Sequence, residues 1–108
     1  MNNYQPDVWV VLRLRGAAVP DGEIFKLLSG WYGGYAGSDS WRLNSGITRV
    51  SAQEDHFLVE GHSGSVYRCV QDSERTSLLT QSIYLDLCDR ARDQGVTVEI
   101  VPMREVSL

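Results

Sequence analysis

The chain has 108 residues, of which 43% are hydrophobic and 22% are charged, and its formal net charge is −4. A chain of this length and balance is expected to fold as one soluble domain over residues 1–108, with no need of a metal or a disulfide. The acidic surplus disfavours direct nucleic-acid binding, which depends on Lys and Arg. No apolar run is long enough to cross a bilayer.

The N-terminal residues and the cysteines indicate the compartment. The first six residues are polar and lack the basic and apolar parts of a signal peptide, so the sequence predicts a cytoplasmic protein. Cys69 and Cys88 both occupy apolar positions in their segments, which favours free buried thiols over a disulfide. His56, His62 and Cys69 match no paired-ligand template for zinc. The sequence therefore predicts no metal and no other cofactor.

The first predicted element is a strand over residues 7–15. Apolar and β-branched residues alternate there, so that one face is buried and the other becomes polar toward Arg13 and Arg15. Residues 16–22 are predicted to form a turn-rich connection, because they include glycine, proline and aspartate.

Residues 23–31 are ambiguous between two elements. Ile24, Leu27, Leu28 and Trp31 are spaced as one stripe of a helix, which Asp21 could cap, so the pattern favours a short helix. A strand leading into the glycines that follow is the alternative. Residues 38–45 are predicted to be a polar loop.

The second half of the chain predicts a β-meander, a long helix and a last strand. Residues 47–51, 57–60 and 65–70 are β-type segments joined by connections of hairpin length. Residues 77–94 carry an apolar residue every four positions, and Gly95 is predicted to end that helix. Residues 96–101 form a final strand, which Pro102 closes, and the last residues are expected to be a loose tail.

These elements predict an α+β fold with one antiparallel or mixed sheet of about four to five strands. The long helix is expected to pack on one face of that sheet, where it would bury Leu79, Ile83 and Leu87. The short helix predicted at residues 23–31 would be the second helix of the fold. The two terminal strands are both β-rich. An unpaired terminal strand at a sheet edge favours a homodimer, whereas pairing between the two terminal strands would favour a monomer.

One segment stands out as a candidate binding surface. Four of the ten aromatic residues lie within eleven residues of each other, between glycines and just before Arg42. Tyr, Trp and Arg are frequent in interface hot spots, and glycine allows close approach. The alternative is that these aromatics only pack in the core. The candidate binding residues are Trp31, Tyr32, Tyr35, Asp39, Trp41, Arg42, Ser63 and Tyr67.

The sequence offers no catalytic motif. The glycines fit neither the dinucleotide-binding nor the P-loop pattern, and the segment from Gly61 to Ser65 has its second glycine one residue too early for a nucleophile elbow. Asp86, Asp89 and Asp93 share a helix face, but the arginines among them indicate a solvated surface. We therefore expect no enzyme and assign no catalytic residue.

The run GWYGGYAGSDSWRLNSGI, followed by HSGSVYRC and a C-terminal helix and strand, resembles small uncharacterised proteins of bacteriophages and prophages. The resemblance covers about residues 24–101. It implies an accessory phage protein that acts in the bacterial cytoplasm by binding a host protein.

Two functions from different classes follow as expectations. The first is a non-catalytic, phage-encoded binding protein that recognises a host protein through the aromatic segment, and antagonism of a host defence complex is one specific form of it. The second is a small-molecule-binding protein in which the same aromatics line a pocket, with Asp39 and Arg42 orienting the ligand.

Overall fold

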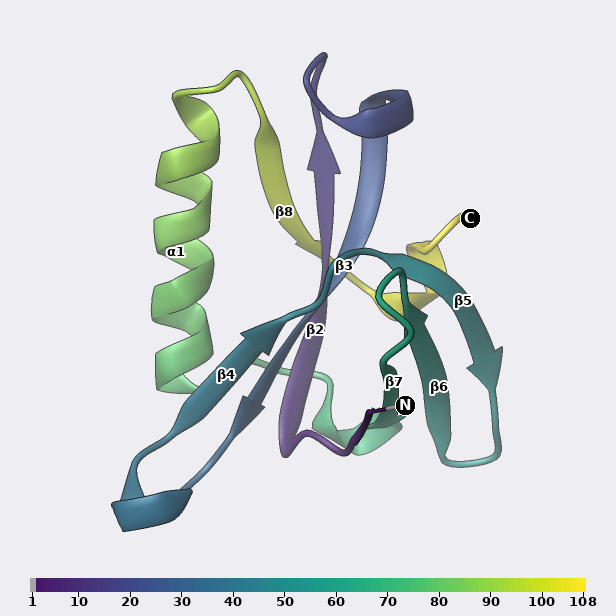
Figure 1. The fold of residues 1–108 in the computed structure, drawn as a ribbon, viewed down its shortest axis with the longest axis vertical. Coiled ribbons are helices and arrows are strands. Elements are labelled where there is room, and N and C mark those ends of the chain that lie inside the picture. Colours follow the sequence, from purple (N-terminus) through teal and green to yellow (C-terminus); the bar gives the residue numbers. More distant parts are fainter. Residues whose placement is uncertain (1) are drawn as a thin grey trace.

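The computed structural model describes residues 2–108, apart from the side chain of Tyr35. The described residues form two four-stranded sheets and one α-helix, an α+β fold in three layers (Figure 1). The central sheet has the strand order β4-β3-β2-β8, and the outer sheet has the order β1-β7-β6-β5. The helix α1 covers one face of the central sheet, and the outer sheet covers the other face.

The central sheet is antiparallel throughout. Its strands are β2 (Val8–Arg15), β3 (Glu23–Trp31), β4 (Ser40–Leu43) and β8 (Thr97–Val101). The strand β2 pairs with β3 on one side and with β8 on the other. The two terminal strands predicted from the sequence, β2 and β8, therefore pair with each other, which is the arrangement for which a monomer is expected.

The outer sheet contains the predicted meander. Its strands β5 (Ile47–Ala52), β6 (His56–Gly61) and β7 (Val66–Val70) pair antiparallel in chain order, as the sequence indicates. A two-residue strand β1 (Asn3–Tyr4) adds to β7 in parallel. The strand β1 was not predicted from the sequence, because two residues are too few to show an alternation of apolar and polar side chains.

The helix α1 (Leu78–Arg92) is the predicted long helix, and residues beside each of its ends cap it. At the start, the Ser77 Oγ accepts from the Thr80 N–H at 3.1 Å while the Thr80 Oγ1 accepts from the Ser77 N–H at 2.8 Å, a capping box. At the end, Gly95 has a φ of 71° and its N–H donates to the Arg92 carbonyl, as expected for a glycine that terminates a helix.

Two apolar cores lie on either side of the central sheet. Trp9, Tyr67 and Val59 are among the buried residues between the two sheets. The core under the helix is smaller. Its buried residues are Val10, Leu12, Leu28 and Val98, with half-buried Ile83 and Leu87 of α1 against them. Of the helix stripe predicted to be buried, Leu79 is only half-buried and belongs to neither core.

The structure corrects four predictions. There are two sheets and not one, because the chain passes from the central sheet to the outer sheet between β4 and β5. Asn44 lies in this connection, and its Oδ1 accepts from the N–H groups of Leu27 and Gly46. Residues 23–31 are the strand β3, and no second α-helix forms in the described residues. The predicted loop at residues 38–45 contains β4.

The fourth correction concerns the end of the chain. The expected loose tail is docked, because a 3₁₀ turn at Met103–Glu105 buries Met103 between the sheets. The Met103 N–H donates to the Glu74 carboxylate at 2.9 Å, in the segment between β7 and α1 that also contains the 3₁₀ turn Gln71–Ser73. An apolar residue just after Pro102 is enough to anchor the tail.

Candidate functional site

The predicted aromatic segment forms a hairpin that extends from the central sheet. The strands β3 and β4 pair from Leu28↔Leu43 to Trp31↔Ser40, and residues 32–39 connect them. Its tip contains the 3₁₀ turn Tyr35–Gly37 and lies beyond the end of α1 (Figure 1). The sequence therefore places its glycine-rich aromatic segment on a projecting part of the molecule.

Backbone hydrogen bonds shape the hairpin tip. The Tyr32 N–H donates to the Asp7 carboxylate at 2.8 Å, and the Gly33 N–H donates to the Asp39 carboxylate at 3.0 Å. Gly33 and Gly37 have positive φ angles of 55° and 78°, which glycine adopts without strain. Gly33 and Gly37 therefore allow the chain to turn here. Asp39, which was predicted as a binding residue, accepts a hydrogen bond from the backbone of the turn.

Gly30 has a different role, because it lies where the hairpin contacts the start of α1. A Cβ atom at this position would come within 2.7 Å of the Thr80 Cγ2 and 3.1 Å of the Val8 Cγ2. Glycine therefore allows β3 and the helix to approach closely. This contact fixes the direction in which the hairpin projects.

The two central residues of β4 face opposite sides of the sheet, as neighbours in a strand do. Trp41 is paired with Gly30, whose missing side chain would point to α1, so Trp41 lies on the helix side of the sheet. Its exposed fraction is 44%, and that of Tyr32 at the hairpin tip is 48%. These two are the predicted aromatics that solvent can reach. The Tyr35 side chain lies outside the described residues.

Arg42 faces the outer sheet and joins an aromatic cluster with Tyr4, Trp31 and Tyr67. Its Nε donates to the Tyr67 hydroxyl at 3.0 Å, and its guanidinium carbon lies 4.8 Å from the centre of the Tyr4 ring. This hydrogen bond to the Tyr67 hydroxyl raises the pKa of Arg42, which therefore stays charged. Arg42 is exposed, and this cluster positions its side chain.

The rings of this cluster connect the two sheets. Tyr4 stacks on Tyr67 with 5.0 Å between ring centres and lies 6.0 Å from Trp31. The Trp31 Nε1 donates to the Gln5 carbonyl at 3.0 Å. Tyr67 is only 1% exposed. Trp31 and Tyr67 therefore help to hold the two sheets together. Tyr4 was not predicted from the sequence, because it lies in the two-residue strand β1.

Ser63 lies away from the hairpin tip. It is exposed in the turn between β6 and β7, where its N–H donates to the Ser45 Oγ at 3.0 Å. Among the predicted aromatics, Tyr32 and Trp41 are exposed, whereas Trp31 and Tyr67 contact Tyr4 in the cluster between the sheets.

The two cysteines lie on opposite faces of the central sheet, Cys69 in the core between the sheets and Cys88 against the core under the helix. Cys69 and Cys88 are both free thiols, as predicted. Burial raises the pKa of Cys69 to about 12, so its thiol is protonated and unreactive. His56 lies at the end of β6 with its Nδ1 2.6 Å from the Asp55 carboxylate, and that hydrogen bond lowers the pKa of Asp55.

The long helix carries charge on its exposed side. Arg90 pairs with Asp86 and Arg92 pairs with Asp89, and all four side chains are more than half exposed. This is the solvated face that the sequence indicates. Within residues 2–108 no three His, Cys, Asp or Glu side chains gather as a metal ion would require.

Comparison with known proteins gives no relative: no protein-family model, no curated protein and no solved structure matches the chain. In the described part of the chain, no helix is both long and apolar enough to span a bilayer. The function is therefore argued from the geometry of the site alone.

Proposed function

We propose that this chain is a non-catalytic binding protein that recognises another protein through the β3–β4 hairpin. The observation that carries this proposal is the exposure of two large aromatic side chains, Tyr32 and Trp41, on a hairpin that projects beyond the helix. Exposed Trp and Tyr on a firmly held backbone contribute large contact area with little loss of side-chain entropy when they bind.

The edge of the central sheet supports the same proposal. The strand β4 is the last strand on its side of that sheet, so one row of its backbone N–H and C=O groups is unpaired by any strand of the described chain. Such an edge can pair with an extended segment of a partner. Trp41 would then contact the partner's side chains on one face of the extended sheet.

The arrangement gives less support to the alternative, a small-molecule pocket lined by the aromatic segment. Trp41 and Arg42 face opposite sides of β4, and Arg42 is already held by Tyr67 and Tyr4. Side chains that converge on one ligand would need to share a face. A partner protein, by contrast, can contact the hairpin tip and one face of it together.

The sequence resemblance to phage proteins extends the proposal to a host protein in the bacterial cytoplasm. A component of a host defence complex is the specific form of partner that we propose to look for first. Nothing in this extension depends on catalysis, a metal or a cofactor.

The test is affinity purification from bacterial extract with mass spectrometry, using the wild-type chain, a Tyr32→Ala/Trp41→Ala variant and a Leu85→Ala control. Leu85 is also exposed and apolar but lies on α1. We expect a partner that the wild type and the control retain and that the hairpin variant loses. Equal recovery with all three baits would contradict the proposal.

A further inference from the structure

A groove lies between α1 and the central sheet, separate from the hairpin surface. The residues that line it come from α1, from the strands β2, β3, β4 and β8, and from the connections between β2 and β3 and between α1 and β8. The groove has a volume of about 330 Å³. We call it the α1 groove, and the residues that define it are Leu12, Leu14, Ile24, Leu43, Leu87 and Ala91.

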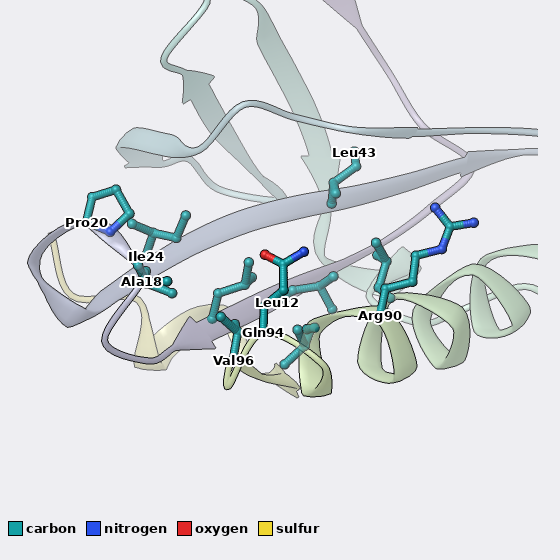
Figure 2. A pocket seen from close by; sticks show the side chains of 13 residues that line it. Leu12, Ala18, Pro20, Ile24, Leu43, Arg90, Gln94 and Val96 are labelled. Carbon is teal, nitrogen blue, oxygen red and sulfur yellow. The ribbon is translucent and has the colours of Figure 1, made fainter.

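Much of the lining of the α1 groove is apolar. Leu12 and Leu14 of β2 line the groove. Ala18, Pro20 and Ile24 gather at one end of it (Figure 2). Ile24 and Leu87 are only half-buried, although they lie beside the core under the helix. Filling the groove with an aliphatic chain would remove this apolar surface from water, which is favourable.

The polar side chains that line the groove are cationic or neutral. Arg90 stands at the end away from Pro20, and Gln94 lies between them, both extending from the helix side (Figure 2). The residues that line the groove include no carboxylate. One Arg90 nitrogen pairs with Asp86 at 3.0 Å, but a guanidinium has five N–H donors, so others remain for a ligand.

A second cation lies next to the groove. Lys26 of β3 is paired with Leu12 of β2, so both side chains are on the helix side of the central sheet. It is the only lysine in a chain of net charge −4. This lysine adds positive charge to the face of the central sheet on which the groove lies, and Arg90 adds positive charge to the groove lining.

From these contacts we propose that the α1 groove binds a monocarboxylic acid with one unbranched aliphatic chain. The chain would lie over Leu12 and Leu14 toward Ile24, and the carboxylate would accept hydrogen bonds from Arg90. The volume is at the small end of the range for ligand sites, which suits one aliphatic chain better than a larger cofactor. This proposal does not depend on the hairpin.

The test is calorimetric titration of the purified chain with decanoate, kept below the concentration at which it forms micelles. We expect saturable binding to one site. Decyltrimethylammonium has an alkyl chain of the same length and the opposite charge. It should bind more weakly by a factor of about ten or more, because it cannot accept a hydrogen bond from Arg90. Equal binding of the two compounds would overturn the proposed role of the carboxylate.

Two arginines of the same helix supply a matched pair of variants. Arg90→Gln should weaken decanoate binding by about tenfold, the order expected when a charge-assisted hydrogen bond is lost. Arg92 makes the same kind of surface ion pair but does not line the groove, so Arg92→Gln should leave the affinity within about twofold. Equal effects of the two substitutions would overturn the assignment of the site.

Ala18→Trp provides a steric test that does not involve charge. Ala18 is exposed and lies in the connection between β2 and β3, so a larger side chain can occupy the groove without disturbing either strand. We expect this variant to keep its circular dichroism spectrum and to lose decanoate binding. Unchanged decanoate binding by the folded variant would overturn the proposal. Self-association of the wild-type chain that Ala18→Trp abolishes would also overturn it, because the occupant of the groove would then be a second copy of the chain.

Discussion

The Nε of Arg42 in β4 lies 3.0 Å from the hydroxyl oxygen of Tyr67 in β7, and this hydrogen bond joins the central sheet to the outer sheet. It also explains why Arg42 and Trp41, although adjacent in sequence, have different roles. Arg42 is exposed but engaged with Tyr67 and Tyr4 on one face, whereas Trp41 on the other face is left to solvent. The hairpin is therefore anchored on one face and available on the other.

The first prediction tests this anchor. Tyr67→Phe keeps the ring that stacks on Tyr4 and removes only the hydroxyl that Arg42 contacts. Tyr67→Leu also removes the ring from a fully packed site, so it should lower the unfolding midpoint in urea more than Tyr67→Phe does. A Tyr67→Leu variant as stable as Tyr67→Phe would mean that the ring stack contributes little.

The second prediction compares two tryptophans. Trp9 is fully buried and its Nε1 donates to the Val70 carbonyl at 2.8 Å, so Trp9→Ala should cost about 3–5 kcal/mol of unfolding free energy. Trp41→Ala should change it by only about 0.5 kcal/mol, as is usual for surface positions. Urea titrations measure both values. A large loss for Trp41→Ala would make this residue part of the fold and remove the main support for the binding hairpin.

The meander and the long helix were predicted more accurately than residues 23–31, and the difference lies in how their apolar residues are arranged. The meander strands and α1 each have one apolar face, and their periodicity located them correctly. The strand β3 is covered by the outer sheet on one face and by α1 on the other. Both faces are therefore apolar, the alternation disappears, and Ile24, Leu27, Leu28 and Trp31 fall by coincidence at helical spacing.

The candidate site was only partly predictable for a related reason. The sequence singled out Trp41 and Tyr32 as candidate binding residues and left open whether they are exposed or core. The strand β4 itself was missed because an edge strand such as SWRL is polar and short. The separation of Trp41 from Arg42 depends on β4 being a strand. The role of Tyr67 depends on contacts with Tyr4 and Arg42, which lie 63 and 25 positions away in the sequence, and no local pattern reports these.

The third prediction concerns Gly30. Gly30→Ala should destabilise the chain by about 1–3 kcal/mol, because the added methyl group would overlap the Thr80 Cγ2. Thr80→Ser removes that Cγ2 and keeps the hydroxyl of the capping box. Gly30→Ala should therefore cost less in the Thr80→Ser background, which a double-mutant cycle measures. Additive effects would show that Thr80 is not what limits this position.

The fourth prediction follows from the buried thiol. The folded-state pKa of Cys69 is raised from its ordinary value of 9.0 to about 12, so folding favours the protonated thiol. The related stability is fully present below pH 9.0 and falls as the pH rises toward 12, because only the unfolded chain ionises this group readily. Wild type should lose about 1 kcal/mol more per pH unit than Cys69→Ala in that window. Parallel pH profiles would contradict the burial of this thiol.

The last prediction concerns the oligomeric state. The strand β2, the more apolar of the two terminal strands, is paired on both sides, with β3 and with β8, so it offers no open edge to a second copy. The edge strand β8 carries Glu99 on the same face as Arg13 of β2, and their ion pair at 2.8 Å places charge at that edge, which disfavours edge-to-edge pairing. We therefore expect a monomer. Sedimentation equilibrium over a tenfold or greater range of concentration should give a constant mass near 12.1 kDa. A mass that rises toward twice this value would instead support a homodimer, and an Ile100→Lys substitution at an exposed position of β8 would then show whether this edge forms the interface.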